Sequence, residues 1–193
     1  EWDVISIQEG SGVWRVGNTS YAPAEAYENH KAAYENLIPY LRAQFPNAEL
    51  YWHQTWAYQQ DTTASAFATY NYDQMTMYNA ITSAVNTKIL TNEDISIVIP
   101  SGTAIQNART SVIGEMTRDG YHLSYGIGRY IASMTFVKAL TGLSIDNSKT
   151  TPDDVDAYEL KAIIESVNNA IDTPYEVTKS SYPIKQGGAG VND

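Results

Sequence analysis

An aspartate and a histidine stand three residues apart in the segment Arg118 to Ser124, directly before an expected helix. On a turn, Asp119 and His122 can share a hydrogen bond, which fixes one imidazole nitrogen and leaves the other as a base for a serine hydroxyl. The same short motif also occurs as a capping aspartate beside a surface histidine. The segment follows the last expected strand and contains flanking glycines, which favours the catalytic interpretation.

Strands alternate with helices along the chain, and this order positions the motif. The expected strands are residues 2–8, 49–57 and 95–100, and the expected helices are residues 23–44, 72–90, 104–113, 125–140 and 151–171. Such alternation predicts an α/β fold with a parallel sheet and helices on both faces. Chemistry in these folds gathers at the carboxyl ends of the strands, here residues 8–12, 54–58 and 100–106.

The composition excludes several classes of function. The chain has 193 residues, enough for one sizeable core, and its 12 basic against 22 acidic residues give a net charge of −10. Such a surface repels phosphate backbones, so we expect no nucleic-acid partner. No apolar run approaches the roughly 20 residues of a membrane span. The absence of cysteine excludes disulfides, thiolate metal sites and cysteine nucleophiles.

Four segments resemble conserved blocks of the SGNH (GDSL-like) hydrolases. Residues 119–124 resemble the last block, in which Asp and His complete a serine triad, and residues 3–12 are similar to the third block, on the central strand. Residues 52–57 and 99–107 resemble an uncharacterised bacterial branch of that superfamily. The order of the segments is specific, although each alone is a weak signal. The resemblance implies a three-layer α/β sandwich with a flavodoxin-like strand order.

The family's first block, a Gly-Asp-Ser or Gly-Asn-Ser that carries the nucleophile, does not occur in this chain. Residues 17–20 are similar to it but follow no expected strand, so we interpret them as a turn. Ser11 and Ser101 lie at strand ends but do not occupy the family's nucleophile position. The chain also opens inside an apparent core strand. We therefore expect an N-terminally incomplete domain over residues 1–172, with its first strands and nucleophile upstream, and a mobile tail over residues 173–193.

Gln8 is the candidate donor to the oxyanion. The third block of the family ends in an asparagine whose amide serves this purpose, but the aligned position here is Gly12. Gln8 lies slightly earlier, at the end of the first expected strand. A donor of this kind stabilises the transition state by roughly 3–4 kcal/mol. The alternative is that Gln8 satisfies amides of the neighbouring loop.

Further substrate contacts are expected at the same strand ends, from Gly10, Ser11, Gln54, Trp56 and Tyr121. The aromatic faces among them suit a sugar ring, and packing between loops is the alternative.

His53 lies within an expected strand beside two tryptophans. We expect a structural or substrate-lining role for it rather than metal ligation, because no second ligand lies at a suitable spacing. His30 is expected to be solvated. Tyr72 and Tyr78, at helical spacing, are expected in the core.

The sequence therefore predicts a serine esterase or acyl hydrolase of SGNH type that removes acetyl or similar groups from a small-molecule or glycan ester. The resemblance implies His122 as general base and then acid, oriented by Asp119, with no metal or organic cofactor. The alternative is an inactive glycan-binding or scaffold protein that keeps the fold. A phosphoesterase would need a metal cluster that three scattered histidines do not form. The amino-acid composition favours an exported protein, periplasmic or extracellular.

Overall fold

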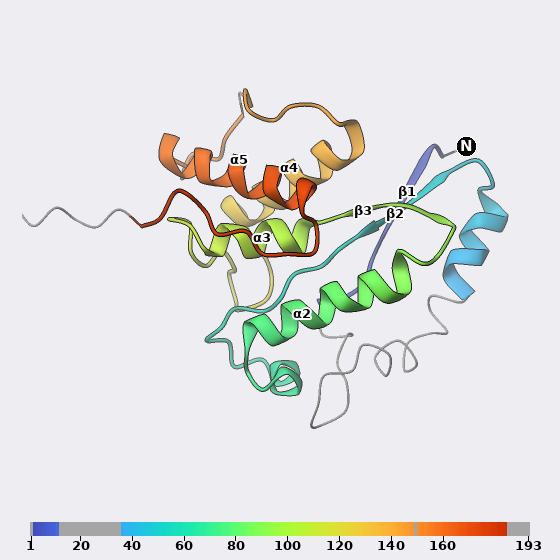
Figure 1. Cartoon of the computed structure of the whole chain (residues 1–193), viewed down its shortest axis with the longest axis horizontal. Helices are drawn as coiled ribbons and strands as arrows, with labels where there is room; N and C mark the ends of the chain where they lie inside the picture. The colour runs from blue at the N-terminus through green and yellow to red at the C-terminus, as the bar shows by residue number, and fades with distance from the viewer. Residues whose placement is uncertain (1, 12–35, 149, 185–193) are drawn as a thin grey trace, which may run out of the picture.

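A three-stranded parallel sheet lies at the centre of the molecule (Figure 1). The computed structural model describes residues 2–11, 36–148 and 150–184. Its strands are β1 (Val4–Gln8), β2 (Glu49–His53) and β3 (Ile95–Ile99), paired in the order β1-β2-β3. Parallel pairing follows from the helical crossovers between short apolar strands. The predicted α/β fold with a parallel sheet is confirmed.

The helical elements match most of the expected segments. They are η2 (Ser65–Tyr70), α2 (Gln74–Ala84), the π-helical turn η3 (Val85–Ile89), α3 (Ser101–Arg109), α4 (Ile127–Thr141) and α5 (Ala157–Asp172). Residues 36–44 are also helical. None of the helices in this described part of the chain is long and apolar enough to cross a membrane.

Helices cover both faces of the sheet. Leu50 and Trp52 of β2 point to one face, where they pack in an apolar cluster with Met77 of α2. His53 points to the opposite face, where its ring meets Phe136 of α4 edge-on with 5.7 Å between ring centroids. The layers are therefore helix, sheet and helix, as expected.

A second apolar cluster joins α3, α4 and α5. It contains Ile105 of α3, Ile131 of α4 and Ile163 of α5, all fully buried. This cluster fixes the two ends of the loop between α3 and α4, which contains Asp119 and His122. The candidate site is thus carried by a packed three-helix unit beside the sheet.

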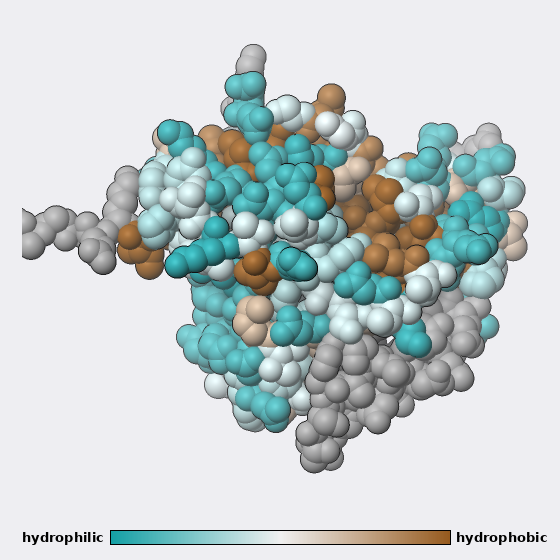
Figure 2. All heavy atoms as spheres, in the orientation of Figure 1, coloured by the Kyte–Doolittle hydropathy of each residue, from teal (hydrophilic) through white to brown (hydrophobic). Residues whose placement is uncertain are grey.

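β1 is less buried than its sequence predicts. Ser6 and Gln8 are exposed and Val4, Ile5 and Ile7 are half-buried, because β1 is the edge strand of the described sheet. The space-filling view shows apolar residues gathered over the strand region between the more hydrophilic helices (Figure 2). The sheet therefore presents an apolar surface on this side of the molecule.

Two helix boundaries differ from the expectation. α3 begins at Ser101, directly after Pro100, rather than at residue 104. α5 begins after Asp156, whose carboxylate accepts from the backbone N–H of Glu159 while the Glu159 carboxylate accepts from the Asp156 N–H. This capping box satisfies two amides at the start of α5, and residues 151–156 precede the helix instead of forming its first turn.

Some side chains and segments lie elsewhere than predicted. Tyr78 is buried as expected, but Tyr72 is 55% exposed, because the backbone is left-handed there and turns before α2 begins. The segment after α5 is hydrogen-bonded to the end of α3 and the turn that follows it as far as Tyr182, while Ile184 is exposed. The Asn107 side chain accepts from Thr178 N–H, and Tyr182 C=O accepts from Val112 N–H. The predictions for His30, Gly12 and residues 17–20, and most of the expected helix at 23–44, lie outside the described residues.

Candidate functional site

Asp119 and His122 form the expected hydrogen-bonded pair. His122 Nδ1 lies 2.7 Å from Asp119 Oδ2, and the backbone N–H of His122 donates to Asp119 Oδ1 at 2.8 Å. Arg118 N–H donates to His122 C=O and closes the turn, and Gly120 supplies its left-handed residue at φ +89°. The turn therefore fixes both the imidazole orientation and the nitrogen that faces the carboxylate.

The electrostatics of the pair keep Asp119 ionised. Partial desolvation raises the pKa of the Asp119 carboxyl, but hydrogen bonds from the His122 side chain, the His122 N–H and the Tyr121 N–H outweigh it and lower the pKa to about 2. Arg118 Nε lies 3.7 Å from Asp119 Oδ2. The carboxylate can therefore stabilise a protonated imidazole at neutral pH.

A pocket of about 390 Å³ opens beside His122. Gln8, Trp56 and His122 all line it, so the structure brings three of the predicted site residues together. Gln8 reaches the pocket because it ends β1, where it pairs in register with His53 at the end of β2. The expected meeting of strand ends at one rim of the sheet is confirmed.

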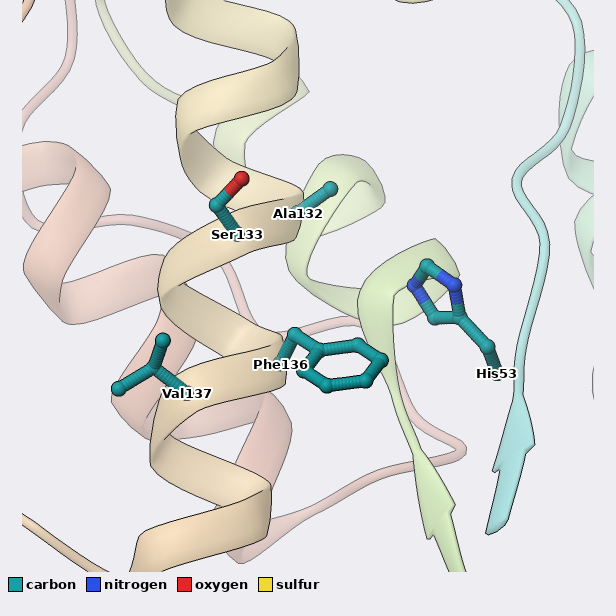
Figure 3. A pocket seen from close by; sticks show the side chains of 5 residues that line it. All are labelled: His53, Ala132, Ser133, Phe136 and Val137. Atoms are coloured by element: carbon teal, nitrogen blue, oxygen red, sulfur yellow. The ribbon is translucent and has the colours of Figure 1, made fainter. Parts of the chain in front are cut away.

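His53 lies between this pocket and a second one of about 340 Å³. Its Nε2 is 2.7 Å from Ser101 Oγ, and burial lowers its pKa to about 4, so the imidazole is neutral at pH 7. Figure 3 shows its ring facing Phe136 and Ala132 of α4 across the second pocket. The pocket-lining role considered for His53 fits this position.

Aromatic side chains form one wall of the site. Trp56 Nε1 donates to the backbone carbonyl of Tyr121 at 2.8 Å. The Tyr121 ring lies 4.3 Å from the His122 ring and 5.4 Å from the Tyr58 ring, measured between centroids. Trp56 lines the pocket, and Tyr121 remains 37% exposed. Packing between loops is therefore seen for both aromatics, and Trp56 also lines the pocket.

Four of the five expected substrate contacts lie outside the pocket lining: Gly10, Ser11, Gln54 and Tyr121. Gln54 is fully buried, and its Oε1 accepts from the N–H and hydroxyl of Thr103, so it links β2 to α3 instead of meeting a substrate. Ser11 Oγ lies 2.5 Å from Thr55 Oγ1 and is engaged there. Gly10 is exposed beyond the end of β1. For these residues, position at a strand end did not imply access to the pocket.

The sequence reasoning missed several residues that line the pocket with His122, among them Arg129 and Ser133 of α4. It also gave no role to Arg118, although that residue opens the motif. A signal for Arg129 was available in the sequence. Arg129 follows Tyr125 by four residues, about one helical turn, which places it beside the loop that contains the motif.

Within the described residues the pair has an acceptor nitrogen but no serine hydroxyl bonded to it, although Ser133 lines the same pocket. No serine of that part of the chain hydrogen-bonds Nε2 of His122; Ser101 is bound to His53, and Ser124 Oγ accepts from Gly128 N–H. The same residues contain no group of three or more His, Asp or Glu side chains placed to hold a metal ion. What the arrangement offers is an oriented base beside a pocket.

Comparison with known proteins assigns the family. Residues 1–170 match the model of a domain of unknown function, DUF4886, whereas no curated protein matches the chain. Among solved structures, the chain is similar to the crystal structure of a DUF4886 family protein from Bacteroides uniformis ATCC 8492, with 39% identity and a TM-score of 0.81 over 92% of this chain. The chain covers 65% of the length of that protein. On the extent of these matches, the chain belongs to the DUF4886 family.

Proposed function

We propose that this protein is a serine esterase or acyl hydrolase of the SGNH type, acting on a small-molecule or glycan ester. The observation that carries the proposal is the 2.7 Å contact of His122 Nδ1 with an ionised Asp119, with His122 lining a pocket. A carboxylate in this position holds the imidazole in the tautomer that accepts a proton at Nε2.

In this reaction, Nε2 of His122 takes the proton of a serine hydroxyl as the serine oxygen attacks the ester carbonyl carbon. The side-chain amide of Gln8 and nearby backbone N–H groups stabilise the resulting oxyanion. The protonated imidazole then gives its proton to the departing alkoxide, which leaves an acyl-serine. Water repeats the sequence and releases the acid, so protons and bonds balance over the cycle.

The proposal places the attacking serine outside the described residues. The chain covers less than two thirds of the length of the similar solved protein, so a longer protein of that size has room for a further strand and turn. β1 has one neighbour among the described strands, and its other edge is where such a strand would pair in parallel and end near Gln8.

The test is hydrolysis of 4-nitrophenyl acetate by the protein from the complete reading frame. His122→Ala should lower kcat by about 10³-fold or more, because the base is lost. The control is Lys161→Ala on the exposed face of α5, which should leave kcat unchanged. A fluorophosphonate probe should label one serine in wild type, and mass spectrometry would locate it. Equal rates for wild type and His122→Ala, or no serine labelled, would overturn the assignment.

The second candidate is a glycan-binding protein without catalysis. The observation that favours it is that no described serine is hydrogen-bonded to His122, while Trp56 lines the pocket and the exposed Tyr121 ring lies against His122. A protein of this kind would bind a sugar and would hydrolyse no ester, either as wild type or as the His122→Ala variant. The labelling experiment above separates the two candidates.

A further inference from the structure

The pocket beside His122 is cationic, although the chain is strongly acidic. Arg118 and Arg129 both line it, and its described lining contains no aspartate or glutamate. The chain as a whole carries a net charge of −10. Two guanidinium groups gathered in one pocket of an acidic protein point to a negatively charged ligand.

Tyr125 holds the two arginines together. The guanidinium carbon of Arg129 lies 4.5 Å from the centroid of the Tyr125 ring, and that of Arg118 lies 4.9 Å from it. Stacking of this kind restricts both side chains before a ligand arrives. Tyr125 itself is 72% exposed, so its ring is not a core residue that the arginines merely cover.

The two arginines differ in how far their charge is already neutralised. Arg118 donates to the carbonyl of Leu123 at 3.1 Å and lies near Asp119. Arg129 has no ion pair with any carboxylate of the described residues, and its side chain is exposed. Arg129 therefore retains the donors for an incoming anion, and the charge of Arg118 adds to the attraction.

We infer that Arg129, assisted by Arg118, binds a carboxylate carried by the substrate of this pocket. The inference rests on the proposed function in naming the ligand a substrate, and it defines the substrate class as an acidic ester. The planar fork of arginine matches the two oxygens of a carboxylate. The volume of about 390 Å³ lies within the range of about 300–1,000 Å³ usual for small-molecule sites, so a monosaccharide unit fits.

The carboxylate can belong to either half of the ester. In a uronic acid it lies on the alcohol, and in a half-ester of a dicarboxylic acid it lies on the acyl group. Calorimetric titration of the complete protein distinguishes these sources, with glucuronate against glucose in one arm and monomethyl succinate against methyl acetate in the other. At low salt we expect at least one anion to bind about tenfold or more tightly than its neutral partner.

Variants assign the effect to the pocket. Arg129→Gln should remove the preference for the anion, and Arg129→Lys should keep part of it, because the charge stays while the fork is lost. Arg129 is exposed, so neither change threatens the fold. The matched control Lys161→Gln removes one cation from α5 and should leave the preference intact. Equal binding of anion and neutral partner in both arms, an unchanged preference in Arg129→Gln, or tighter binding of inorganic phosphate than of either carboxylate would overturn the inference.

These titrations require no catalysis, so their failure is distinct from that of the proposed function. Anion binding that depends on Arg129 in a protein inactive on 4-nitrophenyl acetate would support the carboxylate site and reject the esterase. Hydrolysis of 4-nitrophenyl acetate by a protein that shows no preference for the anion would support the esterase and reject the carboxylate site. If both hold, 4-nitrophenyl hemisuccinate should show a higher kcat/KM than the acetate when the carboxylate lies on the acyl group.

Discussion

His53 Nε2 and Ser101 Oγ lie 2.7 Å apart, and their contact joins the end of β2 to the first turn of α3. Both residues stand at the carboxyl rim of the sheet, where His53 also lines the pocket shared with His122. Burial lowers the pKa of His53 to about 4, so it supports this rim as a neutral group at pH 7. Protonated His53 would carry its charge in a poorly solvated position, so protonation in acid should destabilise this rim of the sheet.

The titration of His53 should be visible in the pH dependence of the protein's stability. The unfolded chain binds the His53 proton with a pKa near 6.5 and the folded chain with one of about 4, so the unfolded state carries more protons between these values. Stability therefore falls as pH falls from 6.5 to 4, by about 3 kcal/mol at most. Urea unfolding between pH 4.5 and 7.5 measures the slope.

His53→Gln should flatten that slope, because the glutamine does not titrate. Lys161→Gln, on the exposed face of α5, is the control and should keep the slope. The pKa of Asp119 is lowered to about 2, so its own contribution is lost only below its ordinary range and leaves this window undisturbed. An unchanged slope in His53→Gln would show that the acid sensitivity has another origin.

Asp119→Asn should lower kcat for 4-nitrophenyl acetate by about 10³–10⁴-fold. An amide in this position favours the wrong imidazole tautomer and provides no charge to stabilise the protonated ring. Asp153→Asn, which removes an exposed carboxylate in the loop before α5, should leave kcat unchanged. If kcat of Asp119→Asn falls by less than tenfold, the aspartate serves only to form the turn, which is the structural alternative for this motif.

Gln8→Ala should lower kcat by about 10²–10³-fold with little change in KM, because an oxyanion donor acts on the transition state more than on the bound ester. The control is Ser6→Ala, on the same exposed side of β1. Stopped-flow or steady-state assays at saturating ester separate the two constants. If KM rises while kcat stays constant, Gln8 belongs to substrate binding instead.

The sequence predicted the arrangement around His122 well where the signal was local. The Asp119–His122 contact depends on the four residues of one turn, and the strand ends depend on short apolar runs that stop at polar residues. Both are properties of neighbouring residues, so they can be inferred without tertiary information. The α/β class follows from the order of those runs, because parallel strands require helical crossovers.

What the sequence did not predict depends on contacts between distant segments. Gln54 stands at a strand end like Gln8, yet it is buried against Thr103, because β2 is central and β1 is an edge. Arg129 becomes a pocket residue only when α4 folds back beside the loop that carries His122. The burial of Gln54 has no signature in the residues that surround it along the chain, and for Arg129 the sequence offers only its spacing from Tyr125.

Gly102→Ala should destabilise the protein more than any glycine change at an open position. A Cβ at Gly102 would lie 2.0 Å from the carbonyl oxygen of Thr55, and the Gly102 N–H donates to Gln54 C=O at 3.2 Å. The backbone of β2 and the start of α3 would have to separate, at a cost of about 3 kcal/mol. Gly142→Ala is the comparison, since its φ of +66° is strained for alanine at about 1 kcal/mol while the space around it is open. In urea unfolding, Gly102→Ala should therefore be clearly less stable than Gly142→Ala.

The displacement caused by Gly102→Ala would also move Ser101 away from His53, so this variant should lower kcat. Equal stability of the two variants would show that β2 and α3 can part without loss, and the rim would then not be the rigid support on which His53 depends.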